Sequence, residues 1–399
     1  MKNTHKSIIA TAAVAALTAV PASGNGFYIP VQAPEATSRG NAFVATANTA
    51  AAVYYNAAGL TQLTEDTLQF GIYSVNLGLD ANIGGTSVSA KDQWQAIPQI
   101  YVAKPINDRL VLGFGLNTPF GLSTEWGNDS PFRNATGAVK AEILYGTLWA
   151  VAGYKVTDTF SVGLGVGVSQ LDGELHTGLG AVPGGPVLEF SGDDTAVAWT
   201  VSARWQPQEQ HAFGIVYRSQ TDFNAKGSSR VKGVGKVDSS LGFITPATLA
   251  VGYSFRPTSK WNIEANIEWV NWEKLNTLTL KNTPVAAAIP IPFNWDNNLI
   301  YGIGATRQLG NGYSFSFGYN YIENSQPDST FTPAVSDADR HWLTLGVGHK
   351  GECWSWDFAY QYAFSDRRVK NVAGPLAPAL NGKYKSRFHS LSLSATYEF

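Results

Sequence analysis

The chain has 399 residues, a net charge of −2 at pH 7, and 15% charged residues, against roughly 25% in ordinary soluble domains. The basic residues do not outnumber the acidic ones, so the composition does not indicate a nucleic-acid-binding protein. The low charge and the 12% of aromatic residues are unusual for a soluble protein but suit a wall that faces lipid.

The first residues resemble an export signal. Basic residues within 2–6 precede an apolar run over 8–20, and small residues follow at 22–24. We therefore expect a signal peptide over 1–24, because the run is shorter than the roughly 20 residues of a membrane-spanning helix. No later segment is long and apolar enough for such a helix, which leaves a secreted soluble protein or a β-barrel.

The next segment, residues 25–66, is rich in alanine and mildly apolar. A disordered tail is usually more charged and less apolar. We expect a compact domain with short helices, which could fill the wide lumen of a large barrel.

Period-two alternation then identifies strands. Large apolar side chains alternate with small or polar ones over 261–269, 313–321 and 354–364. Alternate residues point to opposite faces of a strand, and about 9–11 residues cross a bilayer when tilted. A β-sandwich with one wet face is the alternative, but its strands are nearer 5–6 residues long.

These patterns predict an all-β, transmembrane, antiparallel β-barrel over 67–399, with an N-terminal hatch inside the lumen. We expect about 14 strands, near 67–79, 95–104, 110–124, 138–154, 160–171, 195–206, 211–222, 247–256, 261–271, 297–308, 312–323, 341–349, 354–364 and 386–399. Short links alternate with long ones, which is typical of periplasmic turns and external loops in the bacterial outer membrane.

The third expected strand contains an interruption at Pro119, Phe120 and Gly121. Proline cannot donate to a ladder and glycine often marks a bulge, so we expect a kink there. A strand that simply ends beneath its loop is the alternative reading.

The last strand alternates to a terminal aromatic residue, Phe399. Bacterial barrels commonly end in this way, and the barrel assembly machinery reads the mark. The final strand must close on the first, since an open sheet edge is not tolerated in lipid.

Several short motifs resemble the FadL family of outer-membrane channels. Residues 26–28, 39–43 and 55–61 resemble the family's N-terminal hatch, while 105–108 and 120–126 resemble a periplasmic turn and the third strand. The resemblance covers essentially the whole chain after the expected signal peptide.

The resemblance implies a passive channel for long-chain fatty acids or similar hydrophobic molecules. Ligands would be captured at external loops and released laterally at the third-strand kink, where the hatch motif Asn-Pro-Ala touches the wall. Asn56, Ala57 and Ala58 occupy that motif here, so Ala57 replaces the usual proline. Proline would fix φ and remove a donor, whereas alanine does neither.

A fatty-acid carboxylate favours a basic partner. The family tends to place an arginine after the fifth strand; here His176 is nearby, and Arg204 is another candidate. Neutral aromatic or alkane hydrocarbons are the alternative ligands, and a general aqueous porin is the alternative class. Apolar loop residues at 182–188 and 284–293 are candidate capture surfaces.

Other chemistry finds no support in the sequence. The six histidines show no metal spacing, no nucleophile elbow is present, and no cofactor motif is found. We expect no enzyme activity, and we expect outer-membrane lipid and lipopolysaccharide as surroundings.

Overall fold

The computed structural model describes most of the chain. The described residues are 26–91, 94–127, 130, 132, 138–179, 185–373 and 379–399. The expected signal peptide at 1–24 therefore lies outside the described residues, as do 182–184 of the first capture loop. Within the described part, no helix is long and apolar enough to cross a membrane.

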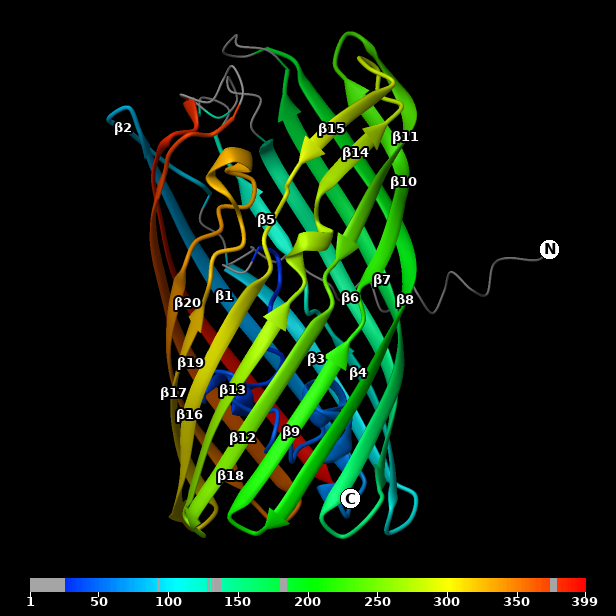
Figure 1. Cartoon of the computed structure of the whole chain (residues 1–399), viewed down its shortest axis with the longest axis vertical. Coiled ribbons are helices and arrows are strands. Elements are labelled where there is room, and N and C mark those ends of the chain that lie inside the picture. The colour runs from blue at the N-terminus through cyan, green and yellow to red at the C-terminus, as the bar shows by residue number, and fades with distance from the viewer. Residues whose placement is uncertain are drawn as a thin grey trace, which may run out of the picture.

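An antiparallel sheet closes on itself to form a barrel (Figure 1). The closure joins β1 (Thr67–Ile83) with β20 (Gly382–Glu398), from Thr67 opposite Glu398 to Asn82 opposite Lys383. The prediction of an all-β barrel with about 14 strands is confirmed.

Several wall strands consist of two consecutive ladder segments. In chain order the wall is built from β1, β3 (Trp94–Pro105), β4 (Leu110–Asn117) with β5 (Leu122–Glu125), β6 (Ala138–Lys155), β7 (Phe160–Gly178), β8 (Val187–Gln208), β9 (His211–Arg218) with β10 (Thr221–Val231), β11 (Gly235–Thr245) with β12 (Thr248–Thr258), β13 (Trp261–Val270) with β14 (Thr277–Lys281), β15 (Ala288–Pro292) with β16 (Asn298–Gly310), β17 (Tyr313–Ile322), β18 (Arg340–Lys350), β19 (Trp354–Val369) and β20. A short strand, β2 (Thr86–Ser89), pairs with the end of β1.

Side-chain burial follows the predicted alternation. On β13, Glu264 and Glu268 are buried in the barrel, while Ile263 and Ile267 are 38% and 50% exposed on its outside. The rings of β17 and β19 lie on the same outer face. The apolar outer surface is therefore the face that meets lipid.

Many strands continue beyond the predicted ends on the loop side of the barrel. The expected loop 172–194 is largely an extended β7–β8 hairpin, and 223–246 holds most of β10 and β11 (Figure 1). Above the bilayer both faces of a strand meet water or other loops, so the apolar alternation fades although the hydrogen-bonded ladder continues.

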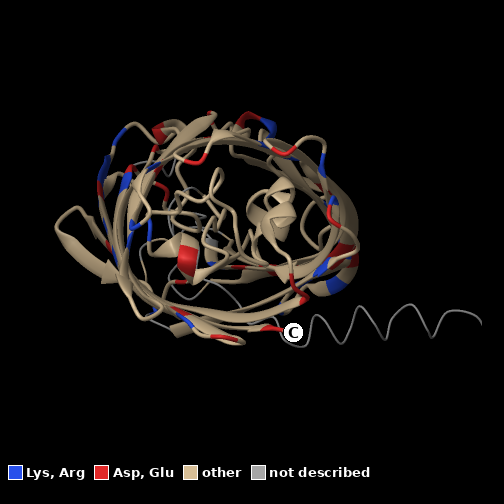
Figure 2. Cartoon of the chain, turned by 90° about the horizontal axis from the view of Figure 1, so that it is seen from below, with Lys and Arg blue, Asp and Glu red and all other residues tan. Residues whose placement is uncertain are grey.

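The N-terminal segment, residues 26–63, lies inside the ring of strands, toward the end with the short turns (Figures 1 and 2). It contains α2 (Pro34–Thr37), α3 (Ala52–Tyr55) and the 3-10 helix η1 (Ala57–Gln62). Two further 3-10 turns, η2 (Trp272–Lys274) and η3 (Asp328–Thr330), belong to external loops.

Small residues allow the N-terminal segment to approach the wall closely. A Cβ on Gly304 would lie 2.1 Å from the carbonyl oxygen of Arg39, and a Cβ on Gly163 would lie 2.4 Å from the nitrogen of Ala58. Glycine inside these strands therefore accommodates the segment's backbone.

Candidate functional site

The third wall strand is interrupted between β4 and β5. The ladder between β3 and β4 runs from Pro105 opposite Val111 to Ile100 opposite Leu116. Beyond residues 118–121, and within the described part of the chain, β5 forms its ladder with β6 and not with β3. The interruption predicted at Pro119, Phe120 and Gly121 is thus present as a break in the wall ladder.

The start of the N-terminal segment pairs with this interruption. Ile29 donates its backbone N–H to the carbonyl of Pro119 at 2.7 Å, and Gly121 donates to the carbonyl of Phe27 at 2.9 Å. Tyr28 and Phe120 form the antiparallel bridge between them. The segment thus serves as a short strand partner where the wall ladder breaks.

Gln32, three residues after Ile29, holds the same part of the wall through its side chain. Its side-chain amide donates to the carbonyl of Thr118 at 2.9 Å and accepts the Thr118 N–H at 3.0 Å. The Gln32 backbone is held in turn by the hydroxyls of Tyr55 and Tyr101, each at 2.8 Å.

An apolar cavity of about 590 Å³ lies on the external side of this contact. Phe27 and Leu122 line it next to the interruption, and Ile289, Ile291 and Phe293 line it from the loop of β15. Phe27 is a shared element, because its ring lines the cavity while its carbonyl accepts the hydrogen bond from Gly121. The cavity therefore adjoins the break in the wall.

The Asn56–Ala58 motif lies elsewhere. Asn56 donates its amide to the carbonyls of Val44 and Ala203, and Ala58 donates its N–H to the hydroxyl of Ser202. This places the motif against β8, and the close approach of Ala58 to Gly163 adds β7. Residues 27–32 contact the interruption at 118–121, whereas η1, which begins at Ala57, packs on β4 in the lower part of the same wall strand.

His176 and Arg204 are not brought together, and neither lines the cavity. His176 is on β7, and its side chain pairs with Glu174 at 2.6 Å. Its neighbours in the strand, Leu175 and Thr177, line the cavity. Arg204 is buried near the segment, where its Nε donates to the carbonyl of Ala45 at 2.8 Å. Its guanidinium is thus engaged by the protein itself.

Two buried carboxylates on β13 anchor the segment. Glu264 accepts the backbone N–H groups of Ala45 and Thr46 at 2.8 and 2.9 Å and the hydroxyl of Thr46 at 2.5 Å. Arg39 approaches it at 3.9 Å, and burial lowers the pKa of the Arg39 guanidinium from its ordinary value.

The second carboxylate, Glu268, belongs to a network with two tyrosines. It accepts the Tyr28 hydroxyl at 2.7 Å and lies 3.4 Å from Arg218, whose guanidinium also donates to the Tyr54 carbonyl at 2.7 Å. Burial raises the pKa of Tyr54 to about 12, so this hydroxyl remains a neutral donor near pH 7. Inward-facing Glu residues in an alternating strand were the sequence signal for these partners.

Arg340, at the start of β18, is a further lumen residue that the sequence analysis missed. It is 1% exposed, and its guanidinium lies 4.9 Å from the ring of Phe388. Asp337 interacts with it electrostatically, but its Nε and Nη1 have no hydrogen-bond partner among the described residues. Phe388 belongs to the same apolar cluster as Phe27 and Leu122.

Several known proteins are similar to this chain over most of its length. Residues 15–399 match the model of the family described as outer membrane protein transport protein (OMPP1/FadL/TodX). A long-chain fatty acid transport protein of Salmonella typhi is 20% identical over 347 residues, which cover 76% of this chain and 78% of the relative.

Solved structures show the same fold. The structure of a Pseudomonas aeruginosa FadL homologue has a TM-score of 0.83 and 20% sequence identity to this chain. The match covers 94% of this chain and 100% of the homologue. The Pseudomonas putida toluene transporter TodX has a TM-score of 0.75 and 16% identity, with 95% and 100% covered. Among the described residues, no group of side chains could hold a metal ion.

Proposed function

Because the chain belongs to the OMPP1/FadL/TodX family of outer-membrane transport proteins, we propose that it is a passive channel that admits hydrophobic molecules and releases them sideways through its wall. Family membership makes it a transport protein of the outer membrane rather than an enzyme. The route and the ligand are the proposal.

The observation that carries the proposal is the contact between the apolar cavity and the wall break. A ligand in the cavity lies against Phe27 and Leu122, and the break at 118–121 begins directly beside them. Movement of residues 27–32 away from the wall would join the cavity to the bilayer.

Lateral release also has an energetic reason. Exposing a methylene group to water costs roughly 0.8 kcal/mol, so a sixteen-carbon chain would lose on the order of 12 kcal/mol in a straight aqueous pore. A wall opening avoids this cost, and a concentration gradient is then a sufficient driving force. The N-terminal segment supports this route as a hatch, because its buried contacts fill the lower lumen.

The ligand class follows from the charges around the cavity. No Lys, Arg or His is among the described residues that line it, and Glu142 and Glu174 of the lining are paired with Lys140. This lining favours a neutral hydrocarbon, the class named for the toluene transporter. Long-chain fatty acids, named for the Salmonella typhi relative, are the second candidate. Arg340 does not line the cavity, but two of its guanidinium nitrogens lack a hydrogen-bond partner among the described residues, and it packs on Phe388 of the apolar cluster that includes Phe27 and Leu122.

The assembly route is part of the same proposal. Phe399 is 66% exposed, while its backbone N–H donates to Asp66 at 2.9 Å. The exposed terminal ring supports its role as the mark for the barrel assembly machinery.

The test combines bound-ligand analysis with transport. Protein purified in mild detergent is extracted and its lipids and hydrocarbons are identified by mass spectrometry, and uptake of a labelled fatty acid and of toluene is measured in cells. We expect the double change Pro119→Val/Gly121→Val to reduce uptake strongly while the barrel still assembles. It restores the backbone N–H that proline lacks and removes the glycine that favours a bulge, so the wall ladder could continue across the break. Undiminished uptake would argue against the lateral route, and steady ion conductance of the unaltered protein in planar bilayers would favour an aqueous porin.

A further inference from the structure

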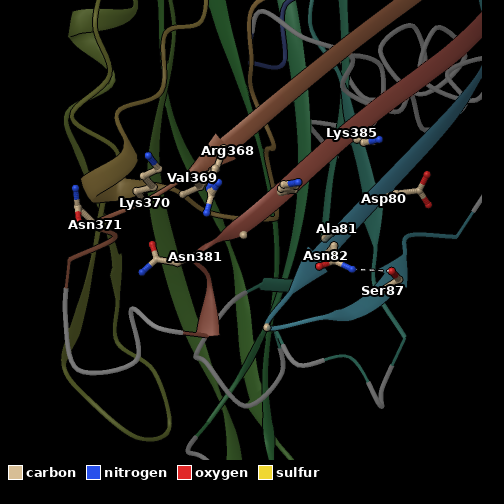
Figure 3. A pocket seen from close by; sticks show the side chains of 13 residues that line it. Asp80, Ala81, Asn82, Ser87, Arg368, Val369, Lys370, Asn371, Asn381 and Lys385 are labelled. Carbon is tan, nitrogen blue, oxygen red and sulfur yellow. Dashed lines mark hydrogen bonds between the residues drawn. The ribbon is translucent and has the colours of Figure 1, made fainter.

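A second depression, of about 960 Å³, lies at the external rim of the barrel, over β19, β20 and β1 (Figure 3). Its lining contains four basic side chains and one acidic one. These are Arg368, Lys370, Lys383, Lys385 and Asp80. In Figure 3, Arg368 and Lys370 lie on one side of the depression, and Asp80 and Asn82 lie on the other.

Strand alternation directs these charges to the outside of the barrel. Val369, Tyr384 and Ala81 are buried, while the charged residues next to them in each strand are exposed. The register places Arg368 opposite Lys383, and Lys383 opposite Asn82. Since neighbouring strands are about 4.8 Å apart, the basic groups form one continuous outer patch.

The patch begins where the lipid-facing surface ends. Arg387 on β20 lies opposite Phe364, and the lipid-facing Leu391 and Leu393 follow farther down the strand. Lys385 and Lys383 lie about 7 and 13 Å above Arg387 along the strand, which is about 5 and 9 Å in height at a 45° tilt. The polar headgroup layer of a bilayer is about 5–8 Å thick on each side, so Lys385 lies within this layer and Lys383, with Arg368 opposite it, lies at its outer edge.

Most of this positive charge is not neutralised by the protein. Asp366 pairs with Arg387 at 2.8 Å and with Lys385 at 3.9 Å, and Asp80 accepts a hydrogen bond from Ser89. The side chains of Arg368, Lys370 and Lys383 form no ion pair with other described residues. On another part of the rim, formed by β6 and β7, the positive charge is neutralised, because Lys140 forms ion pairs with Glu142 and Glu174.

We propose that Arg368, Lys370, Lys383 and Lys385, here called the rim basic patch, bind the phosphate groups of a phosphorylated glycolipid of the outer leaflet. The patch begins within the headgroup layer and extends just above it on the outer face of the wall, and its charge is complementary to phosphate. Arginine binds phosphate oxygens in a bidentate manner, while lysine acts as a compact point charge. The site is on the outer face of the wall, so it is independent of the cavity and of the transport proposal.

Binding of lipid A to the detergent-purified full-length protein tests this assignment. Native mass spectrometry compares lipid A carrying two phosphates with the same lipid after removal of its phosphates. In Arg368→Gln/Lys370→Gln/Lys383→Gln we expect the affinity for the phosphorylated lipid to fall about a hundredfold. The single change Lys383→Gln should lower it about fivefold, and it keeps the test available if the triple variant does not fold.

A matched control removes the same charge elsewhere on the rim. Lys226→Gln/Lys232→Gln/Lys236→Gln alters exposed lysines around the β10–β11 hairpin and should leave the affinity unchanged. Equal losses in both triple variants, or equal binding of the dephosphorylated lipid, would overturn the proposal. Displacement of the lipid by an equal concentration of inorganic phosphate would assign the patch to a free anion instead.

Discussion

Gln32 and Thr118, 86 residues apart in the chain, form two hydrogen bonds: the side-chain amide of Gln32 donates to the backbone carbonyl of Thr118 and accepts its backbone N–H. Thr118 directly precedes Pro119, so this pair holds the N-terminal segment at the start of the wall break. Both backbone groups are buried and would otherwise lack a ladder partner at this point of the strand. Gln32 therefore adds a side-chain clamp to the backbone hydrogen bonds of Ile29 and Gly121 that close the proposed lateral exit.

Gln32→Ala should loosen this contact without unfolding the barrel. Leaving the two buried Thr118 groups without their partner costs about 1–3 kcal/mol, so the Thr118 and Ile29 amides should exchange with solvent about 5–150-fold faster. Hydrogen–deuterium exchange with mass spectrometry measures this change. Gln308→Ala, at an exposed position, is the control, and unchanged protection in Gln32→Ala would show that the pair does not hold the segment.

The prediction for Ala57→Pro concerns the residue that replaces the family's usual proline. Ala57 begins η1, its N–H makes no hydrogen bond among the described residues, and Asn56 before it is extended, with φ −170° and ψ 99°. Proline suits the first position of a helix, and an extended residue suits the position before proline. We expect a gain of about 0.4–1 kcal/mol in the free energy of unfolding, measured by chemical denaturation.

A neighbouring substitution provides the contrast. The Ala58 N–H donates to Asn56 and to Ser202, so Ala58→Pro removes donated hydrogen bonds and should destabilise the protein. Equal effects of the two prolines would mean that the N–H of Ala58 contributes nothing, or that η1 has a different geometry.

Much of the architecture could be predicted from the sequence, because a lipid-facing wall repeats one local rule. The alternation on β13, β17 and β19 predicted which of their side chains point to lipid and which to the lumen. Pro119 and Gly121 predicted the break in the ladder of the third wall strand. The extensions of β7 and β8 could not be predicted, since no lipid enforces apolar alternation above the bilayer.

The contacts of the N-terminal segment were also beyond sequence reasoning. Gln32 is a single polar residue within the apolar stretch 29–34, which has no strand or helix periodicity, and its partner is set by tertiary packing across the lumen. The kink was therefore assigned to Asn56–Ala58 by resemblance, although the structure gives its contacts to residues 27–32. Inward-facing Glu264 and Glu268 were visible in the sequence, but nothing local named Thr46 or Tyr28 as their partners.

Glu264→Gln should weaken the anchoring of the segment. The carboxylate accepts three hydrogen bonds from Ala45 and Thr46, and an amide would present donors to at least one of them. The loss should be about 1–3 kcal/mol, seen as faster proteolysis of the segment and as added ion conductance in planar bilayers. Glu273→Gln, at an exposed loop position, should leave both unchanged. If Glu264→Gln also leaves both unchanged, other contacts hold the segment.

Arg340→Met distinguishes the two candidate ligand classes. Hydrogen bonds to a charged group contribute about 1.5–3 kcal/mol, so loss of the guanidinium should weaken fatty-acid binding about 10–150-fold if the carboxylate reaches it. Methionine keeps much of the apolar volume, so the affinity for toluene should change little. Binding of both ligands is measured with the purified protein, and Arg307→Met, which removes an exposed outward-facing arginine, is the control.

A selective loss for the fatty acid would assign Arg340 as its carboxylate partner. Equal affinities before and after the change would leave the neutral lining of the cavity as the determinant of ligand choice, and an equal loss for both ligands would show that Arg340 supports the structure of the lumen.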